Sequence, residues 1–314
     1  MPKKITVVGA GNVGATVAHL AACRGLGHIV LLDIVPGLAQ GKALDLAQSG
    51  GVEAFGGSVR GTTDWALADQ SDLVIITSGM PRKAGMSRDD LLAKNTAIVQ
   101  SVSDEVRRRC PEAVVIVVCN PLDAMVYAAA KVTGFAATRV LGMAGALDAA
   151  RYAYFLAEEL GVWVGDVHAV LMGGHGDDMV PLPRYTSVAG VPVTELMEPA
   201  RIAAIIERTR NGGMEVVELL GTSAYYAPAA GAVRMAEAIL ADRKAVTCCS
   251  AWCEAEYGVG GAFVGVPVVL GATGVERIVE LELQPAEREA FATSAAHVKA
   301  LMAKVDAFLA ADNG

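Results

Sequence analysis

Residues 5–14 read Ile-Thr-Val-Val-Gly-Ala-Gly-Asn-Val-Gly and carry the strongest fold signal in the sequence. A short β-branched run ends in three glycines with the spacing G-x-G-x-x-G, and a segment of helical length follows. The spacing alone is weak, but a strand, these glycines and a helix together are typical of a dinucleotide-binding turn. Gly9 permits the tight turn, Gly11 lets a pyrophosphate approach the backbone, and Gly14 lets the helix pack close to the sheet. The helix N-terminus would offer unpaired N–H groups to the anion.

Asp33 is the acid that such a site requires. It follows the apolar run Ile29–Leu32 and lies 19 residues after Gly14, close to the roughly 20-residue spacing of a carboxylate that binds the adenosine ribose. A carboxylate there repels a 2′-phosphate, so NAD is favoured over NADP. Asn12 and Val13 open the helix and complete this part of the predicted cofactor site. The competing interpretation is an ordinary strand–helix turn in which Asp33 has no ligand.

Strand-length apolar runs alternate with helix-length segments through the first half of the chain. The predicted strands are Ile5–Val8, Ile29–Leu32, Leu73–Thr77 and Val114–Cys119. The predicted helices are Asn12–Arg24, Leu38–Gln48, Asp89–Arg109 and Leu122–Val132. Nearly continuous apolar strands indicate a parallel sheet that is covered on both faces. The alternation therefore predicts β-α-β units and a doubly wound α/β sheet, a Rossmann domain over residues 1–145.

The pattern changes near residue 145. Helices are predicted at Ala146–Leu160, Glu195–Leu219, Pro228–Leu240 and Pro285–Ala310, and strands at Val167–Met172, Ala245–Tyr257 and Ala262–Leu270. This mixture predicts an α+β substrate domain over residues 146–314. No Pro- or Ser-rich linker separates the halves, so we expect them to share a continuous interface.

Composition excludes several classes of partner. The net charge is −8 and aromatic residues make up 5% of the chain, which argues against nucleic acid or an anionic membrane. No apolar run approaches the roughly 18 residues of a membrane span, and the run after Lys4 is too short for a signal peptide. We therefore expect a cytoplasmic protein. Six cysteines are too sparse for a disulfide scaffold. Cys248, Cys249 and Cys253 are expected at a buried strand or helix edge and not at a metal site.

His175 is the candidate proton-transfer residue. It stands in the segment 172–177, Met-Gly-Gly-His-Gly-Asp, directly after a predicted strand. A histidine flanked by glycines on a loop is accessible, and its ordinary pKa lets it exchange a proton near neutral pH. Alone, however, such a residue is more often an idle loop histidine, so its assignment depends on other segments.

Three segments strengthen that assignment. Asp148 and Arg151 are three residues apart on a predicted helix, so they share a face; Asp148 would orient His175, and Arg151 would bind a carboxylate. Arg82 and Arg88 stand in a glycine-containing loop after Leu73–Thr77, where ligands of parallel sheets bind and lids close. Asn120 precedes a proline at the end of Val114–Cys119. The simpler alternatives are a helical ion pair, a solvated basic loop and a plain Asn-Pro turn.

Together these motifs resemble the lactate/malate dehydrogenase family, and within it the malate dehydrogenases of the lactate-dehydrogenase-like type. The resemblance spans essentially the whole chain. It is carried by the segments Gly9–Gly14, Pro81–Leu92, Cys119–Asp123, Leu147–Tyr152 and Gly173–Met179 in this order. It implies a Rossmann domain, NAD as cofactor, and a small 2-hydroxy acid bound between the two halves.

The resemblance also implies a role for each candidate residue. His175 corresponds to the proton donor and acceptor, Asp148 to its carboxylate partner, Arg151 to the anchor of the C1 carboxylate, and Arg88 to the lid arginine that polarises the reacting carbonyl. Asn95, Val118 and Asn120 correspond to cofactor positions, with Asn120 also near the substrate, and Ser223 to the substrate pocket. Arg82 stands where family members choose their substrate: an arginine there is similar to malate enzymes, a glutamine to lactate enzymes.

The expected reaction is therefore NAD-dependent oxidation of malate, a step of the tricarboxylic acid cycle. Lactate or another 2-hydroxy acid is the nearest alternative substrate, but pyruvate would leave Arg82 desolvated and unpaired. A non-catalytic NAD-binding regulator is a second alternative, although it would not need His175, Asp148 and the arginines. The resemblance implies a homo-oligomer, a tetramer rather than a dimer, and the helices Leu38–Gln48 and Glu195–Leu219 have apolar faces for such contacts.

Overall fold

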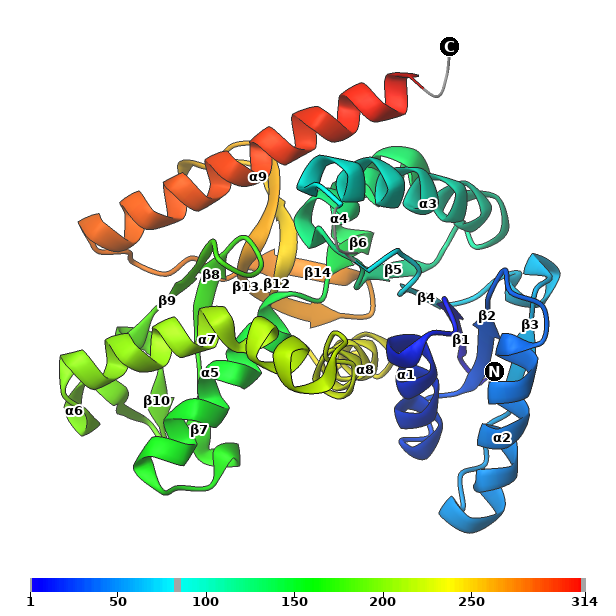
Figure 1. Ribbon diagram of the computed structural model, residues 1–314, viewed down its shortest axis with the longest axis horizontal. Coiled ribbons are helices and arrows are strands. Elements are labelled where there is room, and N and C mark those ends of the chain that lie inside the picture. Colours follow the sequence, from blue (N-terminus) through cyan, green and yellow to red (C-terminus); the bar gives the residue numbers. More distant parts are fainter. Residues whose placement is uncertain (1, 82–85, 312–314) are drawn as a thin grey trace.

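The computed structural model describes residues 2–81 and 86–311, and its N-terminal half alternates strands with helices as predicted (Figure 1). The strands are β1 (Lys4–Val8), β2 (His28–Leu32), β3 (Val59–Thr62), β4 (Leu73–Ile76), β5 (Val114–Val117) and β6 (Val140–Gly142). The helices are α1 (Asn12–Cys23), α2 (Leu38–Glu53), α3 (Arg88–Arg109) and α4 (Leu122–Thr133), with short turns η1 (Trp65–Ala68) and η2 (Ala137–Arg139).

The strands of this half pair in parallel in the order β3-β2-β1-β4-β5-β6. Ile5, Ile75 and Ile116 on the central strands are fully buried, as expected for a sheet covered on both faces. This confirms the doubly wound parallel sheet. In this strand order ligands bind outside the carboxyl ends of the strands, where the order reverses between β1 and β4.

The C-terminal half is α+β, which confirms the second part of the fold prediction. Its helices are α5 (Gly145–Leu160), α6 (Val193–Leu196), α7 (Pro199–Leu220), α8 (Tyr226–Leu240) and α9 (Pro285–Ala311), with turns η3 (Val164–Asp166), η4 (Pro183–Tyr185) and η5 (Glu256–Gly258). Its strands are β7 (Val167–His168), β8 (Leu171–Gly173), β9 (Met179–Pro181), β10 (Ser187–Val188), β11 (Val191–Pro192), β12 (Ala245–Cys253), β13 (Ala262–Gly271) and β14 (Gly274–Ile278).

One sheet runs through both halves. Antiparallel β12 pairs with β6 at Ser250 and Gly142, and the order continues as β13-β8-β9, with β14 also on β13. A separate small sheet has the order β11-β10-β7. On one face α3, α4 and α9 pack together, and on the other face α1 packs against α2 and α8 (Figure 1). One hydrophobic cluster contains Ile5 of β1 together with Val264 of β13 and Val298 of α9. The expected continuous interface between the halves is thus a shared sheet and core.

Several predicted boundaries were wrong. The strand predicted at Val167–Met172 is two strands in different sheets, β7 and β8. The helix predicted at Glu195–Leu219 is interrupted before Pro199, because proline fits the first turn of a helix but not its interior. The strand predicted to reach Tyr257 ends at Cys253.

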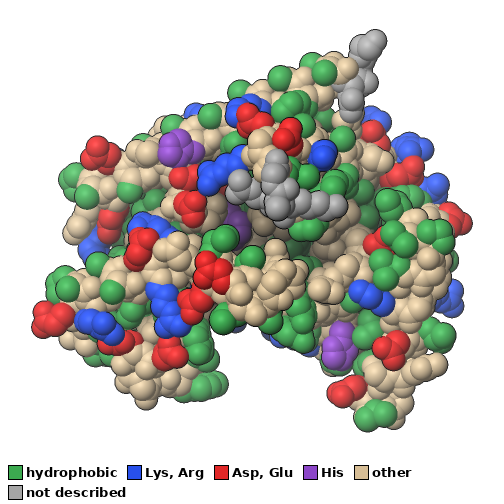
Figure 2. All heavy atoms as spheres, viewed as in Figure 1, with side chains coloured by type: hydrophobic (Ala, Val, Ile, Leu, Met, Phe, Trp, Pro, Cys, Tyr) green, Lys and Arg blue, Asp and Glu red, His purple; other side chains and the backbone are tan. Residues whose placement is uncertain are grey.

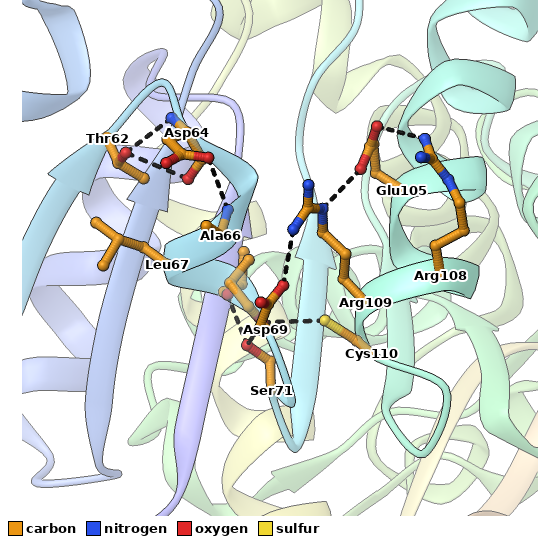
Figure 3. A network of polar contacts seen from close by, with 12 residues as sticks. Thr62, Asp64, Ala66, Leu67, Asp69, Ser71, Glu105, Arg108, Arg109 and Cys110 are labelled. Carbon is orange, nitrogen blue, oxygen red and sulfur yellow. Dashed lines mark hydrogen bonds and ion pairs between the residues drawn. The ribbon is translucent and has the colours of Figure 1, made fainter.

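A polar network holds the C-terminal end of α3 (Figure 3). Arg109 donates to Glu105 on its own helix and, over 3.0 Å, to the Asp69 carboxylate that follows η1. The Cys110 thiol donates to the carbonyl of Ala68. The connection between β3 and β4 is thereby attached to α3, whose other end begins with Arg88. This fixes the helix that carries one of the predicted site arginines.

The surface charges, the cysteines and the helices can be compared with the classes of partner that the composition argued against. Figure 2 shows basic and acidic side chains interspersed on the visible face, without a broad area of one sign among the coloured residues. Cys248, Cys249 and Cys253 are buried on β12, as expected for a strand. Within residues 2–81 and 86–311, no helix is both long and apolar enough to cross a bilayer.

Candidate active site

His175 lies in the loop between β8 and β9. The loop turns at Gly173 and Gly176, which both have φ of +87°, a conformation that glycine adopts at little cost. The backbone N–H of His175 donates to Oδ2 of Asp123 over 3.0 Å. The loop is therefore attached to the first turn of α4, and the ring position is set by the backbone as well as by its side-chain partner.

Asp148 is the side-chain partner of His175. Its Oδ2 lies 2.8 Å from Nδ1 of the ring, and its side chain, in the first turn of α5, is 2% exposed. A buried carboxylate on Nδ1 fixes the orientation of the ring and leaves Nε2 for exchange of a proton with a ligand. The pairing that the sequence suggested is thus present in the structure.

The charges around His175 favour its imidazolium form. Burial by itself disfavours the charged ring, and Arg151 opposes it too, but the charge and hydrogen bond of Asp148 and the charge of Asp123 outweigh both. The pKa of His175 is therefore raised above its ordinary value of 6.5. A raised pKa increases the fraction of His175 that is protonated at neutral pH, and the protonated ring can serve as a proton donor.

Arg151 lies beside the same carboxylate. Its guanidinium is 3.4 Å from Oδ1 of Asp148, and burial lowers the pKa of Arg151 despite that charge. Gly213 of α7 lies next to the guanidinium, where even a Cβ would be in ordinary contact with a guanidinium nitrogen, at 3.7 Å. Asp148 is shared with His175, so Arg151, whose side chain is 17% exposed, is a largely buried cation that is only partly compensated. An anionic ligand with a carboxylate would complete its pairing.

Asp123 is a site residue that the sequence reasoning missed. Its side chain is buried, and burial raises the pKa of its carboxyl. One carboxylate oxygen accepts from the backbone N–H of His175, and the Ser250 side chain lies beside the carboxylate and favours its charged form. The residue stands three positions after Asn120, inside a segment that the sequence reasoning had selected. The available signal was an acidic residue so close to the Asn-Pro turn at positions 120 and 121.

Of the two predicted loop arginines, the structure describes Arg88. Arg82 lies outside the described residues. Arg88 begins α3, where the side chain of Ser87 accepts from the backbone N–H of Asp90. The guanidinium of Arg88 is 83% exposed and lies 3.8 Å from the carboxylate of Asp177, two residues after His175. The structure therefore places Arg88 beside the loop of His175, with its side chain still accessible.

The predicted asparagines differ in their surroundings. Asn95 is buried, and its amide is bonded to the backbone of Met80 and Asn120. The side chain of Asn120 is exposed. Val118 is buried, and its backbone N–H continues the pairing toward β4 by donating to Ile76. Ser223 is exposed on the turn between α7 and α8, and no described contact joins it to His175, so its place in a substrate pocket stays a prediction.

The glycine turn after β1 has the shape that a dinucleotide requires. Gly9 has φ of +102°, and a Cβ on Gly14 would lie only 1.8 Å from the carbonyl oxygen of Gly9. A Cβ on Gly11, which precedes Asn12 and Val13 at the start of α1, would meet no atom within 4 Å. The turn is therefore closed where the helix packs and open where a phosphate would approach.

Asp33 is fixed at the carboxyl end of β2 next to this turn. Its Oδ2 accepts from the backbone N–H of Ala10 over 2.6 Å, and its Oδ1 accepts from Val35 over 3.0 Å. The carboxylate is half-buried. Each oxygen keeps capacity for a further donor such as a ribose hydroxyl. The residues present thus fit NAD.

Family models match both halves of the chain. Residues 3–142 match the NAD binding domain of lactate/malate dehydrogenase, and residues 145–309 match the α/β C-terminal domain of the same family. The chain belongs to the lactate/malate dehydrogenase family. This confirms the resemblance found in the sequence and, with the glycine turn, NAD as the cofactor of this lactate/malate dehydrogenase family member.

Similar proteins in the family include malate dehydrogenases over their full length. The chain is 56% identical to malate dehydrogenase of Rhodopirellula baltica, with 98% of each chain covered. The structure of malate dehydrogenase from Salinibacter ruber has a TM-score of 0.94 at 49% identity, covering 98% of this chain and 99% of that one. A lactate dehydrogenase of Cryptosporidium parvum, complexed with lactic acid and nicotinamide adenine dinucleotide, also has a TM-score of 0.94, at 42% identity with 98% of each chain covered. Backbone similarity alone therefore does not separate the two substrates within the family.

Proposed function

We propose that this protein catalyses the reversible, NAD-dependent oxidation of (S)-malate to oxaloacetate. The observation that carries the proposal is the partly buried cluster in which the buried Asp148 contacts both His175 and Arg151. A proton-transfer group and a carboxylate anchor are thereby held within one site. The malate dehydrogenases among its similar proteins support the choice of substrate.

Each protein group has a defined task in this reaction. Arg151 binds the C1 carboxylate of malate and sets the orientation of C2. Neutral His175 accepts the hydroxyl proton at Nε2, and Asp148 stabilises the imidazolium that forms. When bound, NAD supplies the hydride chemistry. In the reverse direction imidazolium donates a proton to the carbonyl oxygen of oxaloacetate, where Arg88 stabilises negative charge. Each such contact in a water-poor site contributes about 3 kcal/mol.

Arg82 is proposed to select malate over lactate. Its guanidinium would pair with the second carboxylate of malate, which lactate lacks. Replacing Arg82 by glutamine should therefore move the ratio of kcat/KM for oxaloacetate to that for pyruvate toward pyruvate. An unchanged ratio would remove this role from Arg82.

An NADH-oxidation assay tests the proposed function. Oxaloacetate, pyruvate and other 2-oxo acids are compared at saturating NADH, and we expect oxaloacetate to have the highest kcat/KM. The His175→Asn variant should bind NADH but lose turnover. If that variant turned over normally, the enzymatic assignment would fail and an NAD-binding regulator would be the better interpretation.

A homo-oligomer is also proposed, a tetramer rather than a dimer as the resemblance implies. Exposed apolar side chains on two helices support such contacts: Leu44 and Val52 on α2, and Leu219 and Leu220 on α7. Exposed clusters of this kind are common at protein interfaces. Sedimentation or light scattering measures the number of subunits, and a monomer would contradict the proposal.

The remaining assignments concern compartment and domain division. A cytoplasmic location is supported by the six cysteines, which are all free, because reduced thiols persist in that compartment. The reaction would serve the tricarboxylic acid cycle.

We divide the chain into a cofactor domain, 1–145, and a substrate domain, 146–314, at the change from parallel to antiparallel strands after β6.

A further inference from the structure

Asn95 is a buried amide whose hydrogen-bonding groups are all occupied by backbone. Its Nδ2 donates to the carbonyl of Asn120 over 2.6 Å and to the carbonyl of Met80 over 3.2 Å. Its Oδ1 accepts from the backbone N–H of Met80 over 2.7 Å. The residue is 1% exposed. A side-chain amide has two N–H donors, so both donors are used, and almost no surface is left for a ligand.

These three bonds join segments that carry other site residues. Met80 lies just after β4, at the start of the loop that contains Arg82, and Asn120 lies just after β5. Asn95 itself is seven residues after Arg88 on α3, so both stand on the same side of that helix. One amide thus connects the carboxyl ends of two neighbouring strands to the helix of Arg88.

Asn120 differs from Asn95 in what it can offer a ligand. Its side chain is exposed, and no hydrogen bond to it is found among the described residues. Only its backbone carbonyl is engaged, and the partner is Asn95. Asn95 therefore holds the backbone of Asn120 in place. The side-chain amide of Asn120 remains accessible and can contact a ligand.

We propose that Asn95 is a positioning residue for the reaction and not a direct ligand of the cofactor. Its amide holds the main chain at Met80 and Asn120 against α3, so that Arg88 on the same helix and the Asn120 side chain meet the substrate in the productive arrangement. This inference rests on the proposed function, because the groups that Asn95 positions are those assigned to substrate and nicotinamide.

Two variants separate positioning from direct cofactor binding. Asn95→Asp keeps the oxygen that accepts from Met80 but replaces both donors, so an oxygen would face the carbonyls of Met80 and Asn120. Asn95→Leu removes every polar contact at similar volume. For both variants we expect kcat for oxaloacetate reduction to fall about 100-fold, the effect of misplacing reacting groups. The Kd for NADH, measured by fluorescence titration, should stay within about threefold of the wild-type value.

Thr96→Val is the matched control. Thr96 is the next residue on α3, is equally buried, and donates only to Leu92 of its own helix. We expect its kinetics to match the wild type, so a large loss in this variant would show that any buried change on α3 impairs turnover and would overturn the proposal. The number of NADH sites in each preparation corrects kcat for unfolded protein, which separates misplacement from simple instability.

Two further outcomes would also overturn the proposal. A rise in the NADH Kd that accounts for the whole loss of kcat/KM would make Asn95 a direct cofactor ligand. Wild-type kcat per NADH site in both variants would make its role structural only. Wild-type turnover of oxaloacetate in the same assay tests the proposed function separately, because these comparisons are ratios to the wild type.

Discussion

At the scale of single residues, the Asp148–His175 pair makes a prediction about pH. Reduction of oxaloacetate needs imidazolium, so its rate should fall as the pH rises through the raised pKa of His175. Asp148→Asn removes the strongest of the charges that counter burial of the ring, and should move this midpoint about one pH unit lower. The pH dependence of kcat/KM for oxaloacetate measures the shift. Malate oxidation needs neutral imidazole, so its rise with pH should move in the same direction. An unchanged midpoint would mean that Asp148 does not control the ring.

Asp123 makes a prediction about stability. Asp123→Ala leaves the backbone N–H of His175 without its acceptor, and an unpaired buried donor costs about 1–3 kcal/mol. Asp123→Asn keeps an acceptor oxygen and should lose clearly less. Urea unfolding of the two variants and the wild type measures the difference in the free energy of unfolding. Equal losses would show that the charge of Asp123, and not its contact with His175, matters for stability.

Residues of the candidate site that would contact a ligand were predictable from the sequence. Residues that hold other site residues in place were less predictable. The glycine spacing and Asp33 identified the cofactor turn because phosphate and ribose impose that pattern. His175 and Asp148 are 27 positions apart. Their pairing was proposed from the helix face that Asp148 shares with Arg151, and the family resemblance strengthened it. Asp123 was missed because a carboxylate that accepts from a backbone N–H has no characteristic spacing, and its place three residues after Asn120 was the one signal. Asn95 was selected by position, while its contacts with Met80 and Asn120 depend on how three elements meet.

At the level of elements, we expect two glycine-to-alanine substitutions in the turn between β1 and α1 to differ in their effect on stability. Gly14→Ala would place a Cβ 1.8 Å from the carbonyl oxygen of Gly9, so it should cost about 1–3 kcal/mol of stability and also weaken NADH binding. Gly11→Ala is the matched control, because its Cβ would meet no protein atom within 4 Å. It should leave stability within about 0.5 kcal/mol of the wild type, yet weaken NADH binding. Thermal unfolding without cofactor and NADH titration measure the two effects; unchanged NADH binding in Gly11→Ala would place the pyrophosphate elsewhere.

Elements with strong periodicity were predictable, and short ones were not. Buried strands such as β1 and β5 read as continuous apolar runs because both faces are covered. Strand β3 was not foreseen because it contains Arg60 and Gly61. A Cβ at Gly61 would lie 2.1 Å from the carbonyl oxygen of Ala39, so the close packing of α2 on this edge explains the glycine. Strand β6 has three residues and gains its pairing from β5 and β12, which no local pattern reveals.

At the scale of the whole molecule, the shared sheet and core predict one cooperative unfolding transition. The sheet passes from β6 to β12 without a break in pairing, and one hydrophobic cluster draws residues from both halves. Neither half can unfold without exposing apolar surface of the other, so its loss should be coupled to the other half. NADH, which binds at the turn after β1, should therefore raise the Tm of the entire molecule. Calorimetry with increasing NADH measures this, with far-UV circular dichroism as the second probe. Two separate transitions, of which NADH shifts only one, would show that the halves are independent despite their common sheet.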